Sequence, residues 1–547
     1  MNAAELLVRC LENEGVEYVF GIPGEETIDL NEAIANSDSI GFVPTRHEQG
    51  AAFMANAYGR VTGRPGVCLG TLGPGSTNLA TGVADAFLDL APMVALTGQS
   101  PLAQMHKQSH QYIDVMRMLR PVTKWNARVH DPATVPEEVR KAFAVAAQEK
   151  PGATHLELPM DVMRADAAGT PLRRTPGPRS APLEEEIARA ADLIRAAEHP
   201  VVLAGNGVVR QHAAPALRDL CASSGLGVIN TFMSKGVMEH GSGCSLFTAG
   251  LARREYLRGL LGTVDLVVCV GYDLIEWSPQ AWNPDGDLDI VCVDTVPAEI
   301  DAHYVPRVQL IGDIASSVSR LAALLEPRQV PTATRKYEAL LDRALRSGAG
   351  EPADPATPRA ALLAMREAMD RGDVLISDVG AHKLWVARFW PTYEPNTVLM
   401  SNGASSMGFA LPAGIAVALE ARDHRRVVTL SGDGGFLMNI QELETAKRLG
   451  VRLTNIVWTD GAYGVIEVHQ RRAFGHVSGT RFGNPDFVAL ADAFGVAGFR
   501  APTAAEVPGA LRAGLAHEGT SVVEIAIDAR ENDRLADDLS ELVARGR

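Results

Sequence analysis

The chain has 547 residues, of which 46% are hydrophobic and 21% charged, enough apolar material for the cores of three or four domains. Its formal net charge of −15 argues against nucleic acid and anionic membranes as partners, so anionic ligands need local basic groups, helix ends or a metal ion. The six cysteines form no CxxC pair, and neither a basic leader nor a run of about 18 apolar residues occurs, which predicts a reduced, cytoplasmic protein outside the membrane.

Residues 1–165 alternate between helical patterns and short apolar runs. A helix is predicted over residues 4–14, and a helix of small residues follows the second of four predicted strands. Those strands lie at residues 16–20, 40–44, 67–71 and 93–97. The alternation is typical of a doubly wound parallel sheet, in which functional residues gather at the C-terminal ends of the strands.

A Pro- and Arg-rich linker is predicted at residues 166–183, and a second α/β unit at residues 184–327. The Gly205-Asn206-Gly207 turn follows the first strand of this unit, so a dinucleotide site stays open, although a lone Gly-x-Gly is a weak sign of one. A second linker with one short helix is predicted at residues 327–358. The strands of this central unit are predicted at 200–204, 227–230, 266–270 and 290–294.

A third α/β unit is predicted at residues 358–530, and a helical tail at 531–547 with its helix over 532–544. Its strand pattern is similar to that of the first unit, although we find no repeat of sequence between them. The predicted fold class is therefore α/β, with three doubly wound parallel-sheet domains at residues 1–165, 184–327 and 358–530.

The most informative stretch is Ser431-Gly432-Asp433-Gly434-Gly435-Phe436, which an apolar run enters and a helical pattern leaves. A second apolar run then ends at Thr459-Asp460-Gly461-Ala462-Tyr463-Gly464. This order predicts a βαβ unit with both turns at one edge of a parallel sheet. A glycine-rich turn at a helix start lets backbone N–H groups approach an anion.

Asp433 and Asp460 lie at the ends of these two predicted strands, 27 residues apart, which fits one crossover. A Gly-Asp-Gly tripeptide alone is more often a tight turn with a capping Asp. Two carboxylates beside an anion-binding turn instead predict a Mg²⁺ site that holds a diphosphate.

This pattern resembles the signature of thiamin diphosphate-dependent enzymes, and Thr459-Asp460 stands where many members have Asn-Asn. An Asp there also occurs in acetolactate synthases of the catabolic type. The resemblance extends from about residue 4 to 530 and implies the thiamin diphosphate-binding fold. The other matching segments are residues 21–24, 46–55, 73–78, 98–99, 110–111 and 121–126.

The resemblance assigns roles to residues at these motifs. Glu48 would activate the cofactor through a hydrogen bond to its pyrimidine ring, a role that suits a buried carboxylate; without the motif it reads as a helix-start carboxylate. Gln111 would position the acceptor, and Phe53 would contact substrate. The implied metal ligands are Asp433, Asp460 and the carbonyl of Ala462. The implied cofactor-binding residues are Pro23, Gly24, Glu48, Thr71, Asn78, Gly380, His382, Met407, Gly432, Asp433, Gly434, Gly435, Asp460, Ala462, Tyr463 and Gly464.

In the family the pyrimidine binds to the first domain of one subunit and the diphosphate to the third domain of its partner. The resemblance therefore implies a homodimer or homotetramer with its sites at the subunit interface. Met407 stands at the family position whose side chain supports the bent cofactor, although a Met is also common core filler.

The segment from Val270 to Trp277 resembles the middle domain of catabolic, FAD-independent acetolactate synthases, so FAD is not expected. The implied reaction condenses two pyruvate molecules to 2-acetolactate and CO₂. His469 stands where a Gln is expected, and Glu467 where several thiamin-dependent decarboxylases carry Glu. Both are predicted to lie near the 2-oxo acid substrate.

A proton donor at Glu467 would favour aldehyde release, so a 2-oxo acid decarboxylase, or a carboligase with another acceptor, is the alternative function. A solvated position for Glu467 on a helix face is equally open. A non-catalytic relative is disfavoured because Glu48 and Asp433 are intact. A nucleotide-binding regulatory protein is disfavoured because it would not need the segment from Arg46 to Gly50.

Overall fold

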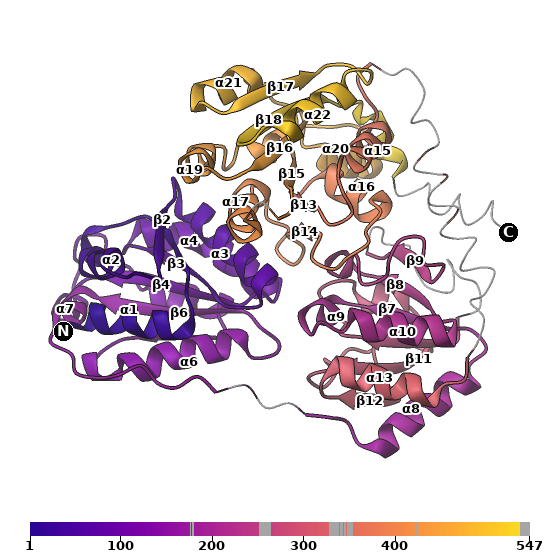
Figure 1. The fold of residues 1–547 in the computed structure, drawn as a ribbon, viewed down its shortest axis with the longest axis horizontal. Coiled ribbons are helices and arrows are strands. Elements are labelled where there is room, and N and C mark those ends of the chain that lie inside the picture. The colour runs from indigo at the N-terminus through magenta and orange to yellow at the C-terminus, as the bar shows by residue number, and fades with distance from the viewer. Residues whose placement is uncertain are drawn as a thin grey trace.

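The computed structural model describes residues 1–175, 177, 180–250, 264–327, 339, 343, 346, 354–422 and 424–535. Its strands form three parallel sheets of six strands each, with helices packed against them (Figure 1). This arrangement confirms the predicted α/β class with three doubly wound sheets. The first domain and the central domain lie side by side in Figure 1, and the third domain lies above both.

The first sheet has the strand order β2-β1-β3-β4-β6-β5. Successive residues point to opposite faces: Val67 packs with the core under α1, and Cys68 with the core under α3. The strands are β1 (Tyr18–Gly21), β2 (Gly41–Pro44), β3 (Gly66–Gly70), β4 (Met93–Gln99), β5 (Trp125–Arg128) and β6 (Ala153–Pro159). The helices are α1 (Ala3–Glu14), α2 (Ile28–Ala35), α3 (Glu48–Thr62), α4 (Pro74–Leu88), α5 (Val115–Leu119), α6 (Val135–Ala147) and α7 (Met160–Arg164).

The third sheet, in the order β14-β13-β15-β16-β18-β17, repeats the order of the first, in agreement with the similar strand patterns of the two units. Its strands are β13 (Val374–Ser377), β14 (Val398–Met400), β15 (Val427–Gly432), β16 (Leu453–Thr459), β17 (Ala497–Ala501) and β18 (Thr520–Ala526). The helices are α15 (Pro358–Ala368), α16 (Ala381–Phe389), α17 (Ala410–Ala421), α18 (Asp433–Phe436), α19 (Glu442–Leu449), α20 (Gly464–Phe474), α21 (Phe487–Phe494) and α22 (Val507–Ala516), followed by the 3-10 helix Ala529–Arg534.

The central sheet has the order β12-β11-β10-β7-β8-β9, which is the strand order of dinucleotide-binding folds. Its strands are β7 (Pro200–Ala204), β8 (Gly227–Asn230), β9 (Ser245–Thr248), β10 (Leu266–Val270), β11 (Asp289–Asp294) and β12 (Val308–Ile311). Its described helices are α8 (Glu184–Ala196), α9 (Asn206–Arg210), α10 (Ala214–Ser224), α12 (Pro279–Trp282) and α13 (Ile314–Leu324).

The first and third domains share one buried apolar cluster where α3 packs against α17. The rings of Phe53 and Phe409 meet edge to face in this cluster, with their centroids 5.6 Å apart. Small residues such as Ala51 and Ala413 let the two helices approach closely. The two domains therefore form a joint core, and α4 lies beside this contact (Figure 1).

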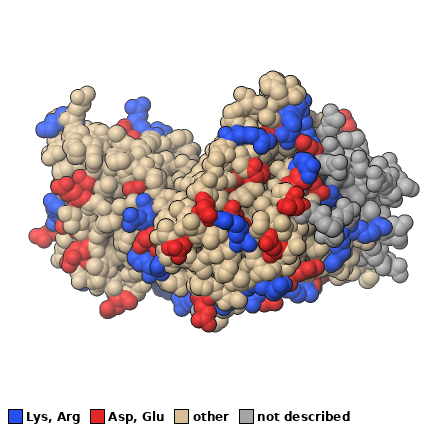
Figure 2. Space-filling view, turned by 90° about the horizontal axis from the view of Figure 1, so that it is seen from above, with Lys and Arg blue, Asp and Glu red and all other residues tan. Residues whose placement is uncertain are grey.

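The linker at residues 166–183 contains neither a helix nor a strand in its described part, as predicted. The predicted helix at 532–544 overlaps the 3-10 helix Ala529–Arg534, and residues 536–544 lie outside the described residues. The short helix predicted within 327–358 also falls largely outside them. On the face in Figure 2, basic side chains are interspersed with acidic ones. None of the described helices is both long and apolar enough to cross a bilayer.

Candidate active site

The third domain holds a cavity of about 310 Å³ at the C-terminal ends of β13, β15 and β16. Ligands of doubly wound sheets bind at this edge, where neighbouring strands connect in opposite directions. All the residues predicted to bind the cofactor in this domain line the cavity: Gly380, His382, Met407, Gly432, Asp433, Gly434, Gly435, Asp460, Ala462, Tyr463 and Gly464.

The turn after β15 requires glycine at positions 434 and 435, because the side chains of Tyr463 and Asp378 lie too close for a Cβ atom. A Cβ atom on Gly434 would lie 2.8 Å from Cε1 of Tyr463, and one on Gly435 would lie 2.9 Å from Oδ2 of Asp378. Larger residues would therefore displace both the wall of the cavity and a buried carboxylate. The turn keeps its backbone exposed to the cavity because it carries no side chains at these two positions.

Asp433 is almost fully buried and accepts four hydrogen bonds. Its Oδ2 accepts from the amides of Asp460 (3.1 Å) and Gly461 (2.8 Å) and from Nδ2 of Asn484 (2.7 Å). Its Oδ1 accepts from the amide of Gly434 at 2.8 Å and from no other group of the described residues. The two strand ends therefore meet as predicted, and Oδ1 of Asp433 is the oxygen with capacity for a further ligand.

Asp460 is the second carboxylate of this edge. Burial and the neighbouring Asp433 raise the pKa of Asp460 to about 6. Its Oδ1 accepts from the amide of Ala462 at 3.1 Å, which leaves Oδ2 as the oxygen that can bind a metal. Asp433 is buried and the adjacent Asp460 is half-buried, and such a pair of carboxylates fits a divalent cation with oxygen ligands.

His382 and Lys383 approach the same cavity from the start of α16. The Nε2 atom of His382 is buried and makes no hydrogen bond to the described residues. Burial lowers the pKa of His382 to about 4, so the ring is neutral near pH 7. An unpartnered ring nitrogen at the cavity wall fits a polar ligand atom there, such as a diphosphate oxygen.

Glu48 begins α3 in the first domain and is 7% exposed. Its Oε2 accepts a hydrogen bond from Nδ2 of Asn78 at 2.9 Å. A Cβ atom on Gly75 would lie 3.3 Å from Oε1 of Glu48 and 2.9 Å from Cγ2 of Thr71. Gly75, the second residue of α4, therefore lets three predicted residues, Glu48, Thr71 and Asn78, meet.

Gly24 and Gln111 lie at the same edge of the first sheet. A Cβ atom on Gly24 would lie 2.4 Å from Cβ of Thr71, and the preceding Pro23 is exposed. The side chain of Gln111 is exposed and its φ is +55°, next to Gly73. The structure therefore brings the first-domain candidates to one edge, but not to the cavity in the third domain of the same chain.

Two interpretations from the sequence are corrected by burial. Phe53 is 0% exposed and packs on Phe409, so its side chain supports the core instead of facing a substrate. Glu467 is 4% exposed, so it is not a solvated helix-face residue. Its carboxylate accepts from Arg471, Thr480 and Arg481, each at 3.0 Å.

His469 is exposed and lines a second cavity of about 200 Å³. This cavity shares the walls formed by Ala381, Leu384, Val465 and Asn532 with the first one. His469 therefore lies beside the cavity with the two carboxylates and not within it. Glu467 is not among the described residues that line either cavity.

Three polar residues of the site were not singled out from the sequence. Asn484 binds Asp433 from 51 residues further along the chain, and Asn532 reaches the cavity from the 3-10 helix after β18. Lys383 lines the cavity directly after His382. No motif marks the two asparagines, because the fold alone brings them to the edge of the sheet.

In the central domain, the Gly205-Asn206-Gly207 turn lies between β7 and β10, where a dinucleotide would bind. The Asn206 amide donates to both oxygens of Glu276, at 3.0 and 3.2 Å, and the hydroxyl of Thr231 donates to the same carboxyl group. Burial raises the pKa of Glu276 to about 8. The Glu276 side chain therefore accepts the hydrogen bond from the Asn206 N–H group that a phosphate would otherwise accept.

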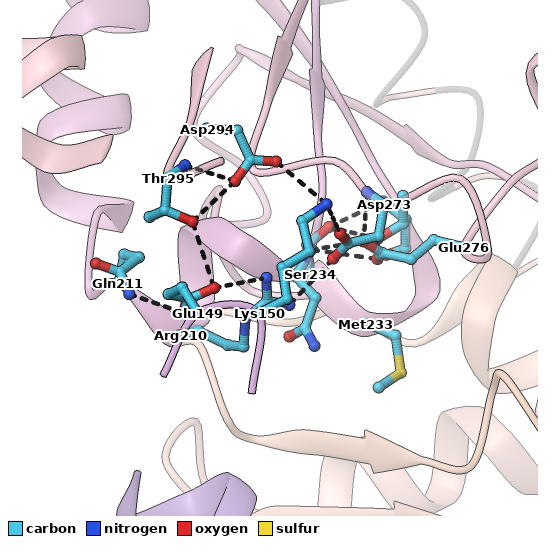
Figure 3. A network of polar contacts seen from close by, with 12 residues as sticks. Glu149, Lys150, Arg210, Gln211, Met233, Ser234, Asp273, Glu276, Asp294 and Thr295 are labelled. Atoms are coloured by element: carbon cyan, nitrogen blue, oxygen red, sulfur yellow. Dashed lines mark hydrogen bonds and ion pairs between the residues drawn. The ribbon is translucent and has the colours of Figure 1, made fainter. Parts of the chain in front are cut away.

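Residues of the first domain complete this cluster, as Figure 3 shows. The ammonium group of Lys150 contacts Asp273 and lies 3.5 Å from Oδ2 of Asp294. Glu149 accepts from Nε2 of Gln211 at 2.7 Å. Ion pairs between two domains thus surround the turn that was the candidate nucleotide site.

Comparison with protein families gives a match for each domain. The N-terminal TPP binding domain of thiamine pyrophosphate enzymes matches residues 1–118, their central domain residues 187–321, and their C-terminal TPP binding domain residues 378–525. These three matches follow the order of the three sheets.

Three relatives match nearly the whole chain. The acetolactate synthase of Bacillus subtilis (strain 168) is 36% identical over 543 residues, covering 98% of this chain and 95% of that protein. The catabolic acetolactate synthase of Raoultella terrigena is 35% identical over 545 residues, covering 98% and 96%. The acetolactate synthase isozyme 1 large subunit of Escherichia coli (strain K12) is 31% identical over 538 residues, covering 96% and 94%. The chain therefore belongs to the acetolactate synthase family of thiamin diphosphate-dependent enzymes and is a transferase of that type.

Proposed function

We propose that this protein condenses two molecules of pyruvate to 2-acetolactate and CO₂. The observation that favours this reaction over release of an aldehyde is the position of Glu467. Its carboxylate is buried among Arg471, Thr480 and Arg481 and is not one of the described cavity residues. Aldehyde release needs a proton donor at the reacting carbon, whereas the carboxylate of Glu467 is directed to Arg471, Thr480 and Arg481.

The cofactor of this proposal is thiamin diphosphate with Mg²⁺. Asp433, Asp460 and the carbonyl of Ala462 would hold the metal, and the glycine-rich turn with His382 would contact the diphosphate. When bound, thiamin diphosphate supplies the nucleophilic carbon that adds to the 2-oxo acid. Met407, half-buried at the cavity wall, would support the cofactor.

The residues of the chain would divide the remaining work. Glu48, held by Asn78, would keep a hydrogen bond to the cofactor's pyrimidine ring. The amide of Gln111 would orient the second 2-oxo acid without adding an acid group. His469, beside the cavity, would supply a further donor towards the substrate carboxylate.

We infer an even-numbered homo-oligomer, a dimer or a tetramer, from the separation of the two residue groups. Glu48 and Asn78 lie in the first domain, whereas the described cavity is lined by residues of the third domain alone. A complete site needs both groups around one cofactor. A twofold axis that brings the first domain of one subunit to the third domain of another provides this arrangement.

We further propose that the enzyme works without FAD. Glu276 binds the Asn206 amide at the start of α9, and Lys150, Asp273 and Arg210 surround it with ion pairs. A flavin dinucleotide would have to displace a buried, hydrogen-bonded side chain to place its phosphates there. The purified protein should therefore show no flavin absorbance and should need no added FAD.

A reducing compartment, the cytoplasm, is the location we propose. All six cysteines are free and buried, and burial raises the pKa of Cys10 and Cys292, in each case to about 11. Thiols of this kind are stable structural residues in a reducing environment.

Identification of the product tests the proposed function. Purified protein is incubated with pyruvate, thiamin diphosphate and Mg²⁺, and the mixture is followed by ¹H NMR. We expect 2-acetolactate as the main product, and more acetaldehyde from Gln111→Ala than from wild type. Acetaldehyde as the main product of wild type would replace the proposal with the decarboxylase alternative.

A further inference from the structure

The loop of residues 401–408 connects β14 to α17 and carries two residues of the cavity wall, Ser405 and Met407. Its far end is fixed within the third domain. The Gly408 amide donates to Asp378 at 2.9 and 3.0 Å, and Nδ2 of Asn439 donates to the Gly408 carbonyl at 2.8 Å. The near end of the loop is fixed by another domain.

Asp89, which directly follows α4 in the first domain, binds two consecutive amides of the loop. It accepts from Asn402 at 3.1 Å and from Gly403 at 2.6 Å. A Cβ atom on Gly403 would lie 2.8 Å from the carbonyl oxygen of Leu88, so the loop backbone rests directly on the end of α4. Asp89 is buried, and hydrogen bonds to a buried carboxylate are among the stronger ones in a protein.

Asp85, one turn earlier on α4, binds the first residue of the loop. Its Oδ1 accepts from the hydroxyl of Ser401 at 2.5 Å, and its Oδ2 accepts from Nδ2 of Asn56 at 2.8 Å. Oγ of Ser401 in turn accepts from the amide of Ser406 at 2.8 Å. Through Ser401, Asp85 on α4 therefore also holds Ser406, the residue that precedes Met407.

Two cations balance these carboxylates. Nη1 of Arg60 lies 3.6 Å from Oδ2 of Asp89 and donates to the Met400 carbonyl at 2.9 Å. Nζ of Lys383, whose side chain lines the cavity, donates to the Ser401 carbonyl at 2.7 Å and to Oγ of Ser405 at 3.2 Å. The buried cluster is therefore close to neutral and touches the loop at four positions.

We propose that Asp85 and Asp89 are positioning residues: from the first domain, they hold the 401–408 loop so that Met407 meets the cofactor in the third domain of the same chain. This inference rests on the proposed function only in taking thiamin diphosphate as the ligand of the cavity. Asp85 and Asp89 act through the loop and touch neither cofactor nor substrate.

Asp89→Asn tests the proposal, because it keeps the shape of the side chain and removes its charge. Hydrogen–deuterium exchange of the cofactor-free protein should become at least about tenfold faster at Asn402 and Gly403, the scale expected for weakening hydrogen bonds to a charged group. The dissociation constant of thiamin diphosphate, measured by calorimetry at saturating Mg²⁺, should rise about tenfold with it.

Asp265→Asn is the matched control, because Asp265 also binds two consecutive amides, those of Glu198 (2.7 Å) and His199 (2.9 Å), but in the central domain. It should change exchange at those amides and leave cofactor affinity within about twofold of wild type. Gly403→Ala is the second test, since it pushes the loop off Leu88 while every charge stays in place. It should reproduce the loss of affinity even if Asp89→Asn does not fold.

Unchanged exchange at Asn402 and Gly403 in Asp89→Asn would overturn the anchor. Faster exchange with unchanged cofactor affinity in both variants would overturn the link to the cavity. Neither measurement depends on turnover, so a wild-type protein that binds thiamin diphosphate but forms no 2-acetolactate would refute the proposed function and leave this inference to be judged by exchange and affinity.

Discussion

Replacing Glu467 by Gln tests the interaction on which the assignment of the product depends. The carboxylate accepts hydrogen bonds from Arg471 and Arg481, whose side chains are 35% and 67% exposed, and from buried Thr480. Water can solvate both arginines after the change, so each lost pair is worth about 0.5–1 kcal/mol, not the about 3–5 kcal/mol of a fully buried pair. With a weaker acceptor for Thr480, we expect Glu467→Gln to cost about 1–3 kcal/mol.

Thermal unfolding and product analysis measure the two consequences separately. The melting temperature should fall by several degrees, at about 2–4 °C per kcal/mol for a domain of this size. The ratio of 2-acetolactate to acetaldehyde should stay at the wild-type value. Glu444→Gln is the control, because it breaks another Glu–Arg pair four residues apart, with Arg448, where both side chains are more than a third exposed. A melting temperature like that of wild type together with a shifted product ratio would refute the structural role of Glu467.

Two substitutions and a light-scattering measurement test other parts of the site, and a third substitution tests a buried histidine. Glu48→Gln should bind cofactor but turn over about 10²–10⁴-fold more slowly, and a variant with more than half of wild-type activity would contradict the role of Glu48. Asp433→Ala should lose cofactor binding in calorimetry, and equal affinity with and without a chelator in wild type would contradict the metal site. Light scattering should find an even-numbered oligomer, and an active monomer would oppose the shared site. Burial lowers the pKa of His155 from 6.5 to about 3, so the ring stays neutral in the folded protein at pH values where the unfolded chain binds a proton. The stability that the neutral ring contributes is therefore complete above pH 6.5 and is lost as the pH falls towards 3. Between pH 6.5 and 5, wild type should therefore lose about 2 kcal/mol more than His155→Gln in denaturant titrations, and parallel pH profiles would refute this contribution.

The parts of the site that the sequence predicts lie where a strand ends in a glycine-rich turn. Gly432 and Gly435 mark such a turn, and the 27-residue spacing from Asp433 to Asp460 places both carboxylates at one edge of the sheet. Local residue chemistry is sufficient there, because parallel connections bring consecutive strand ends together. Strands such as β10 and β15 were predicted because each carries a run of apolar residues, which is local information of the same kind.

Other features depend on contacts between distant segments. The sequence left Glu467 open between a substrate-side proton donor and a solvated residue, because its partners Thr480 and Arg481 come from the loop after α20. The sequence predicted that Phe53 contacts substrate, because its burial depends on α17 of the third domain, far along the chain. Asp89 carries no motif of its own, and its role emerges only where the end of α4 meets the 401–408 loop.

Short strands at sheet edges were missed for a different reason. The edge strands β5, β9 and β12 are short, and β5 is only partly buried, so none has the long apolar run of the inner strands. The pairing of such strands depends on their neighbours more than on their own residues. Edge position is not the whole reason, because the edge strand β2 was predicted, whereas the inner strand β6 was not, although all of its residues are buried.

The stoichiometry of pyruvate consumption tests the central claim most directly. Purified protein with thiamin diphosphate and Mg²⁺ is given limiting pyruvate, and released CO₂ is measured against pyruvate consumed. Condensation predicts one CO₂ for every two pyruvate molecules, with the remaining carbon recovered as 2-acetolactate. One CO₂ for each pyruvate, with acetaldehyde as the other product, would contradict the account.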